Sequence, residues 1–97
     1  MSQILMIEKS ESKRIRVEIR RVLIDVWDPI GIKGIPQASG EYDDYLADIM
    51  ELLANERPDE EIAKHLLEIV TVRMGLTAAS LEDMFPAARA LRAISLT

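Results

Sequence analysis

The sequence predicts an all-α fold, a single-domain helical bundle of three main helices plus a short C-terminal helix, with a long ordered loop between the first two helices. Apolar residues recur at helical spacing over four segments. Beyond the first seven residues, Val, Ile and Thr alternate with polar residues over no strand-length window. Pro and Gly gather between residues 28 and 40, where a helix cannot continue. The length of 97 residues suits one domain, residues 1–97.

The first helix is expected to begin at a cap formed by Ser10 or Ser12 and to end at Pro29 and Gly31. Its apolar residues follow one buried stripe. The stripe consists of Ile15, Ile19, Val22, Leu23 and Val26. In the following loop, residues 28–40, the three isoleucines are expected to pack against the core in an Ω-like segment. They are Ile30, Ile32 and Ile35.

The second helix is expected at about residues 41–55 and the third from Pro58 to Gly75. The second buries one side, formed by Tyr42, Tyr45, Leu46, Ile49, Leu52 and Leu53. The third buries Ile62, Leu66, Ile69 and Val70. The same spacing places Arg73 on the apolar face of the third helix, where a buried guanidinium needs a carboxylate partner. Candidates are Asp25, Asp28 and Asp43.

The C-terminal helix poses a conflict between two signals. Ser80 and Asp83 have the spacing of a capping box, but Pro86 would break a helix that began there. A helix that begins near Asp83, with Pro86 in its first turn, resolves this conflict. It is expected to bury Met84 or Phe85, then Ala88, Leu91 and Ile94.

The composition limits the class of protein. The net charge is −5, and residues 25–68 carry twelve Asp and Glu against three Lys and Arg. Such an acidic surface repels nucleic acid and suits a basic partner, although a solvated acidic surface is the common alternative. The absence of cysteine excludes disulfides and favours a reducing compartment. Since residues 4–7 are too short an apolar run for a signal peptide or membrane span, a soluble cytoplasmic protein without membrane contact is expected.

One junction gathers aromatic, acidic and turn-forming residues between two helices. Its candidate binding residues are Trp27, Asp28, Tyr42, Asp43 and Tyr45. Because carboxylates at helix ends cap backbone N–H groups, Asp28 and Asp43 are expected to have structural roles. The alternative is a pocket that uses the same five residues to bind a small molecule or to catalyse a reaction.

An acidic stripe on the second helix is the candidate partner surface. It consists of Glu41, Asp44, Asp48 and Glu51. A metal site is not expected, because side chains on one straight helix face do not converge on a cation. His65 is the only histidine and falls at the edge of an apolar face near Val72, so a boundary position is predicted. No cofactor is expected either.

A second apolar strip on the first helix consists of Val17 and Ile24, about 180° from the buried stripe. Flanking arginines edge it, namely Arg14, Arg16, Arg20 and Arg21. Either residues 4–7 fold back over the strip, or it is an interface with another subunit or a partner, where arginine is enriched. Nucleic-acid binding is not expected, since the chain has few aromatic residues for base stacking.

Several motifs occur in a characteristic order: WDPIG at 27–31, EYDDY at 41–45, LL at 52–53, EEI at 60–62 and MGL at 74–76. Their order and spacing resemble a family of small bacterial all-helical proteins of unknown function, over about residues 15–76. Residues 77–97 form an extension outside the resemblance. Some chains of this type occur among immunity proteins that neutralise toxins delivered between bacteria, so the resemblance implies a similar role.

These observations favour a non-enzymatic protein-binding module, and its sharpest version is an immunity or inhibitor protein that binds a basic toxin domain through its acidic surface. The alternative is a small-molecule-binding or catalytic domain built on the junction of Trp27, Asp28, Tyr42 and Asp43. A homo-oligomer that pairs the Val17 and Ile24 strips is compatible with either function.

Overall fold

Residues 9–96 are described by the computed structural model, and every regular element within them is helical, which confirms the predicted all-α class. The four α-helices are α1 (Lys9–Val22), α2 (Leu46–Ala54), α3 (Asp59–Glu68) and α4 (Leu81–Arg92). A π-helical turn extends α1 as η2 (Leu23–Trp27), and another extends α3 as η5 (Ile69–Arg73). Two 3₁₀ turns, η3 (Pro36–Ala38) and η4 (Asp43–Tyr45), lie in the connection from α1 to α2. With twelve residues, α4 is longer than α2, which has nine.

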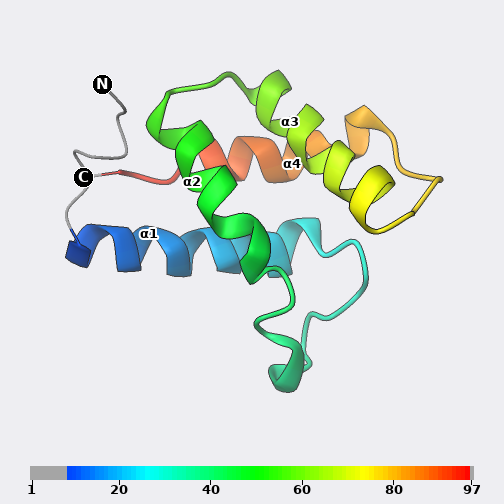
Figure 1. The fold of residues 1–97 in the computed structure, drawn as a ribbon, viewed down its shortest axis with the longest axis horizontal. Helices are drawn as coiled ribbons and strands as arrows, with labels where there is room; N and C mark the ends of the chain where they lie inside the picture. The colour runs from blue at the N-terminus through cyan, green and yellow to red at the C-terminus, as the bar shows by residue number, and fades with distance from the viewer. Residues whose placement is uncertain (1–8, 97) are drawn as a thin grey trace.

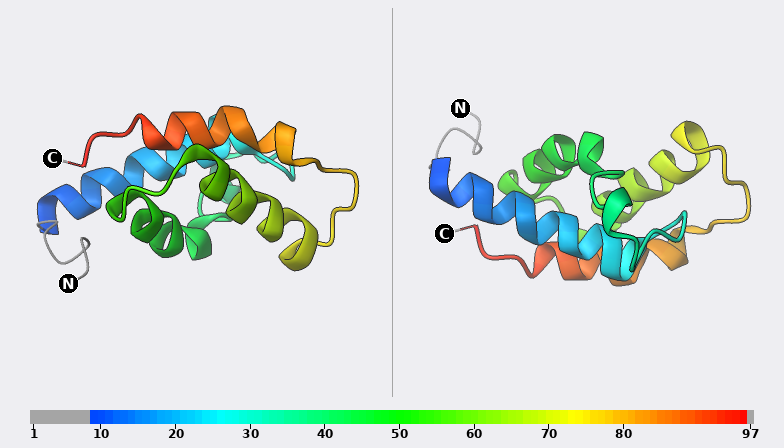
Figure 2. Two further views of the ribbon diagram at one scale, coloured as in Figure 1. Left: turned by 90° about the horizontal axis from the view of Figure 1, so that it is seen from above. Right: turned by 90° about the horizontal axis from the view of Figure 1, so that it is seen from below.

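The helices form two layers. In Figure 1, α1 and α4 run along the long axis of the molecule, and α2 crosses in front of them. The two views in Figure 2 agree that α1 and α4 lie side by side in one layer, while α2 and α3 form the other. The closest packing joins α3 to α4 and α1 to α2. Each helix of the second layer therefore rests mainly on its own partner in the first.

The core lies between the two layers, and every α-helix contributes to it. Its fully buried larger side chains are Ile15, Ile19, Leu23, Tyr42, Leu46, Ile49, Ile62, Leu66, Val70 and Leu91. All but Tyr42 are aliphatic, and the set matches the periodicity of the sequence closely. Burial of apolar area at about 25 cal/mol per Å² is the main contribution to the stability of such a bundle.

The buried stripe of the first helix ends differently from the prediction. Val26 is 46% exposed, whereas Trp27 is only 9% exposed. The reason is the π-helical turn of η2, in which Asp28 N–H donates to the carbonyl of Leu23 at 2.8 Å. The extra residue in this turn rotates Trp27 into the stripe and Val26 out of it. Ser10 and Ser12 lie within α1 rather than at its cap, and the Ser12 hydroxyl contacts Met50 Sδ at 3.8 Å.

The loop after η2 packs less of its apolar surface than predicted. Ile32 is buried, as expected, but Ile30 and Ile35 are exposed. The carboxylate of Asp28 binds the backbone N–H of Ile32 and holds this residue against the core. Ile30 and Ile35 lie outside the core because the chain turns on either side of Ile32, at Gly31 and Gly34, which both have positive φ.

The second and fourth helices begin at other residues than predicted. A 3₁₀ turn replaces the expected first turn of α2, with hydrogen bonds from Asp43 N–H to Gly40 O and from Tyr45 N–H to Tyr42 O. In α4, the Ser80–Asp83 capping box is formed after all, and Pro86 lies inside the helix. Pro86 is exposed and removes one backbone donor only, so the helix tolerates it.

Arg73 is exposed, which contradicts the predicted buried ion pair. Its guanidinium lies 5.6 Å from the ring centroid of Tyr45, a cation–π distance. The π-helical turn η5 again explains the difference, since it changes the direction of the side chains that follow Ile69.

Candidate functional site

The aromatic part of the predicted junction is packed as core. Tyr42 is fully buried, and its ring centroid lies 5.2 Å from that of Trp27 at an interplanar angle of 58°. Tyr45 meets Trp27 edge-on, with centroids 6.1 Å apart and planes at 88°. The indole Nε1–H of Trp27 donates to Met84 Sδ of α4 at 3.3 Å. These contacts join the end of α1, the start of α2 and α4 in one cluster.

Asp28 organises the polar part of the junction from a left-handed backbone conformation, with φ of 31°. Its Oδ1 accepts hydrogen bonds from Ile32 N–H at 2.7 Å and from the Tyr42 hydroxyl at 2.8 Å. Its Oδ2 accepts from Lys33 N–H at 3.0 Å. The Tyr42 oxygen in turn accepts from Ile30 N–H at 3.3 Å. The carboxylate therefore caps the loop, which is the structural role predicted for it.

These contacts shift the pKa values of both groups. Partial burial acts to raise the pKa of the Asp28 carboxyl, but the hydrogen bonds from Ile32, Lys33 and Tyr42 outweigh it and bring the pKa below its ordinary value. Burial raises the pKa of Tyr42 well above its ordinary value, and the hydrogen bond to the Asp28 carboxylate adds to this effect. At neutral pH the pair is thus a charged acceptor and a neutral donor, as the geometry requires.

Asp43 has a different partner. Its carboxylate forms a bidentate pair with Arg20 of α1, with both N···O distances at 2.8 Å. This pair fastens η4 to the outer side of α1. Arg20 is therefore engaged within the molecule, although it belongs to the predicted partner strip.

The structure brings together four of the five residues predicted for the junction, Trp27, Asp28, Tyr42 and Tyr45, and fills the space between them, whereas the carboxylate of Asp43 binds Arg20. The two rings nearest its centre are buried, and the polar atoms of Asp28 and Tyr42 already have partners within the molecule. A ligand site needs a concave cavity with polar groups that are free to bind. The packing of the junction favours a structural role.

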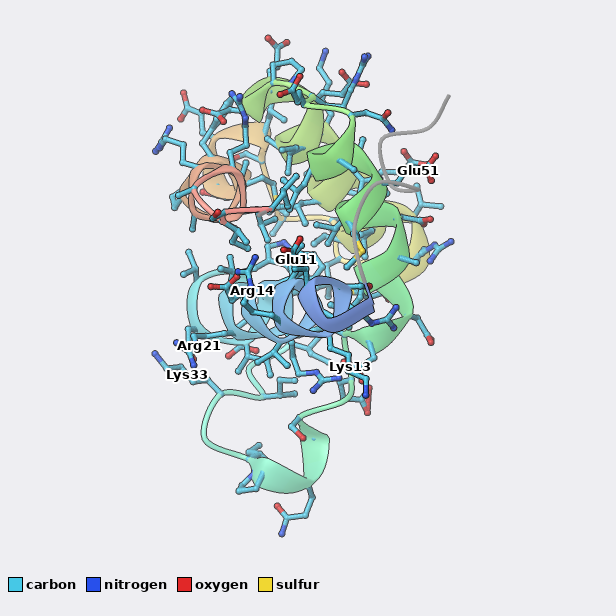
Figure 3. The ribbon with its side chains drawn as sticks, turned by 90° about the vertical axis from the view of Figure 1, so that its left-hand side faces the viewer. Glu11, Lys13, Arg14, Arg21, Lys33 and Glu51 are labelled. Carbon is cyan, nitrogen blue, oxygen red and sulfur yellow. The ribbon has the colours of Figure 1, made fainter. Side chains whose placement is uncertain are left out.

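The predicted acidic stripe, in contrast, is open. All four of its carboxylates are exposed, and none belongs to an ion pair within residues 9–96. Asp44, Asp48 and Glu51 follow one another at spacings of four and three residues, so they occupy one side of η4 and α2. Figure 3 shows Glu51 projecting outward from α2. Glu41 comes earlier in the sequence than these three residues and lies in the turn before η4.

Beside this stripe lies a groove between α2 and α3, which we call the α2–α3 groove. Its wider part has a volume of about 450 Å³ and is lined by Asp48, Glu51, Leu52, Asn55, Arg57 and His65. Its narrower part, about 190 Å³, is lined by Asp48, His65, Glu68, Ile69, Val72 and Arg73. Asp48 and His65 line both parts. The groove arises because α2 packs mainly on α1 and α3 mainly on α4.

His65 distinguishes this groove from an ordinary polar surface. The side chain is partly buried, as its boundary position predicted. Its Nε2 atom is buried and has no hydrogen-bond partner within the described part of the chain. Buried polar atoms nearly always have a partner, and an unsatisfied one costs about 1–3 kcal/mol. Sequence reasoning placed His65 on a boundary but missed its position beside Asp48, because this depends on how α2 and α3 are arranged.

The predicted strip on α1 is partly open. Val17 and Arg21 are exposed, Ile24 is partly buried against the core, and Arg20 pairs with Asp43. Residues 4–7, the segment expected to cover the strip in one interpretation, lie outside the described residues.

Metal sites and membrane spans are two further possibilities for residues 9–96. No group of three or more His, Cys, Asp or Glu side chains is arranged to hold a metal ion there. None of the helices in that range is long and apolar enough to cross a membrane.

Neither a family model nor a curated protein nor a solved structure matches the chain. The family resemblance therefore stays a prediction.

Proposed function

We propose that this chain is a non-enzymatic protein-binding module, and that its partner is a basic protein that docks on the acidic stripe and inserts side chains into the α2–α3 groove. The observation that carries this proposal is that the carboxylates of Asp48 and Glu51, exposed and unpaired within residues 9–96, line an open groove together with His65, whose buried Nε2 has no partner there. Partner cations would meet these carboxylates, and a rotation of the imidazole on binding would bring Nε2 to a partner donor.

An immunity or inhibitor protein is the sharpest form of this proposal. The chain has a net charge of −5, and Asp44, Asp48 and Glu51 are exposed on one side. Such a surface could mask the basic cleft of a nuclease toxin and would accelerate association by long-range attraction. The family resemblance implies the same role. The rival function, a small-molecule or catalytic site at the junction, is disfavoured because Trp27 and Tyr42 fill that space.

Affinity capture from the lysate of the source cell, with mass spectrometry of the retained proteins, tests the proposal. Wild-type protein and the variant Asp48→Asn/Glu51→Gln serve as baits at low and moderate salt. The variant Glu56→Gln/Glu82→Gln is the matched control, because it loses the same net charge at exposed carboxylates outside the groove. We expect a basic protein that wild type and control retain and the groove variant loses.

The association kinetics of this protein with the retained basic protein provide a second test. The association rate should fall roughly tenfold or more as salt rises from low to physiological levels, since surface charges steer the encounter. If the retained protein is a toxin, its activity should be inhibited by wild type more strongly than by the groove variant. A partner that binds both acidic variants equally well would refute the proposed surface.

A further inference from the structure

The narrower part of the α2–α3 groove is lined by carboxylates from two different helices. It lies where α3 continues as η5, at the far end of α3 from the connection to α2 (Figure 1). Asp48 lines it from α2, and Glu68 lines it from the end of α3. Both side chains are exposed, and neither belongs to an ion pair within residues 9–96. Because a carboxylate only accepts hydrogen bonds, one cation placed between the two helices could donate to both.

The same pocket also has an apolar side, formed by Ile69 and Val72 of η5. Ile69 is buried, but Val72 is 73% exposed, more than any other large apolar side chain among residues 9–96. An exposed aliphatic surface beside carboxylates suits a long cationic side chain, which lays its methylene stem on apolar surface. The pocket volume of about 190 Å³ equals roughly six water molecules at about 30 Å³ each. The pocket therefore has room for one such side chain.

The charges around the whole groove are predominantly negative. The carboxylates that are unpaired within residues 9–96 are Asp44, Asp48, Glu51 and Glu68. Of the two cations that line the groove, Arg57 is held by Glu61 in a bidentate contact, with N···O distances of 2.8 and 3.0 Å. The other, Arg73, lies over the ring of Tyr45, 5.6 Å from its centroid. One guanidinium without a carboxylate partner thus stands against four free carboxylates, so the groove attracts a further cation.

We infer that the narrower part of the groove binds an arginine side chain of the basic partner. Its guanidinium would lie between Asp48 and Glu68, and its stem would lie on Val72. A guanidinium is planar, has five N–H donors and is weakly hydrated, so it can pair with two carboxylates in a partly enclosed pocket. The ammonium of lysine is more strongly hydrated and loses more on entering it. This inference rests on the proposed function, because it names the side chain that the partner inserts.

A second copy of this chain is a poorer source of the arginine. Arg16 and Arg21 of α1 are exposed, so a copy could offer one of them. Such a head-to-tail contact leaves both ends open and extends into chains of subunits. In addition, each copy carries a net charge of −5, so two copies repel one another. A basic partner meets neither obstacle.

An NMR titration with two synthetic peptides tests the inference. Each peptide consists of three repeats of Gly-Ser-X, where X is Arg in one peptide and Lys in the other, so the two carry the same charge. Binding to the full chain is followed through the backbone amide signals of Glu68 and Val72. We expect the Arg peptide to shift these signals and to bind at least roughly threefold more tightly than the Lys peptide.

Matched variants locate the preference for arginine. Glu68→Gln should bring the ratio of the two affinities close to one, whereas Glu82→Gln should leave it unchanged, because Glu82 is an exposed carboxylate of α4 outside the groove. Val72→Ser should weaken the Arg peptide roughly twofold or more, whereas Val26→Ser, at an exposed valine of η2, should not. Circular dichroism confirms that each variant is folded.

Three outcomes would overturn the inference. The first is equal affinity of the two peptides, or no binding of either, and the second is the same change of the ratio by Glu68→Gln and Glu82→Gln. The third is self-association in sedimentation experiments that Glu68→Gln abolishes, because a second copy would then supply the arginine. None of these outcomes removes the proposed function, which fails instead if no basic protein is captured in a manner that depends on Asp48 and Glu51.

Discussion

The Trp27–Tyr42 junction and the α2–α3 groove differ in one respect, which is whether their polar atoms already have partners. In the junction, the carboxylate of Asp28 and the hydroxyl of Tyr42 bind each other and nearby backbone groups. In the groove, the Nε2 of His65 is buried without a partner, and the nearby carboxylates of Asp48 and Glu51 are unpaired among the described residues. The most unusual residues of the sequence thus stabilise the fold, whereas polar groups of α2 and α3 are left without partners among the described residues, which is why we propose the groove as the binding surface.

Truncation of the junction should have the largest effect on stability. We expect Trp27→Ala to lower the free energy of unfolding by about 3–5 kcal/mol, because it removes a buried indole that contacts Tyr42, Tyr45 and Met84. Urea unfolding followed by circular dichroism measures the loss. Val72→Ala, at an exposed side chain that lines the groove, is the control and should change stability by less than about 0.5 kcal/mol. If both variants lost a similar amount of unfolding free energy, the junction would not be more important for stability than the groove.

Removal of the Tyr42 hydroxyl should have the next largest effect. Tyr42→Phe keeps the ring packing but takes a donor from Asp28 and an acceptor from Ile30 N–H. We expect a loss of about 1–2 kcal/mol, the cost of a broken hydrogen bond to a charged group. Tyr45→Phe is the matched control, since Tyr45 contributes ring contacts to the cluster. An equally stable Tyr42→Phe protein would mean that the polar network contributes little.

The Asp28 carboxylate should make stability depend on pH. Its pKa is lower in the folded than in the unfolded chain, so its ionised form favours folding. This contribution is complete above the unfolded-state pKa of about 4 and is lost as the pH falls through the lower folded-state pKa. Wild type should therefore lose more unfolding free energy between pH 6 and pH 3 than Asp28→Asn, and the two curves should converge at low pH. Parallel curves would contradict this role of Asp28.

The pair of Arg20 and Asp43 should have the smallest effect. A double-mutant cycle with alanine at both positions should give a coupling energy of about 0.5–1 kcal/mol, near the upper end for exposed pairs, because the contact is bidentate. The Glu60–Lys64 pair is the comparison, since its side chains are 65% and 63% exposed, against 37% and 39% for Asp43 and Arg20. A larger coupling for Glu60–Lys64 would indicate that the Arg20–Asp43 contact does not fasten η4 to α1.

Periodicity predicted the helices well but missed their π-helical ends. A rule of 100° per residue places Val26 and Arg73 on buried faces, but each lies in a five-residue π turn that rotates it outward. Nothing in the composition of these turns marks the extra residue. The predicted starts of α2 and α4 were also wrong, each for its own reason. Before α2, the tethered Tyr42 favours a 3₁₀ turn. In α4, the exposed Pro86 is tolerated inside the helix.

The junction and the α2–α3 groove differ in how much of their structure the sequence could predict. The residues of the junction are close in the chain, so their proximity was predictable, but whether they formed a pocket or a core depended on ring packing. Asp48 and His65 line the same α2–α3 groove because α2 packs mainly on α1 and α3 mainly on α4. Neither helix pattern contains this information, and the orphaned Nε2 of His65 becomes visible only in three dimensions.

The most direct test of the account is a two-dimensional ¹H–¹⁵N NMR titration of the wild-type protein with a Lys-rich amphipathic peptide. We predict shifts for Asp48, Glu51 and the His65 side chain, while the indole N–H signal of Trp27, held by Met84 in the core, stays in place. Shifts at the Trp27 indole with an unchanged groove, or no shifts at either region, would contradict the claim that the α2–α3 groove is the binding surface.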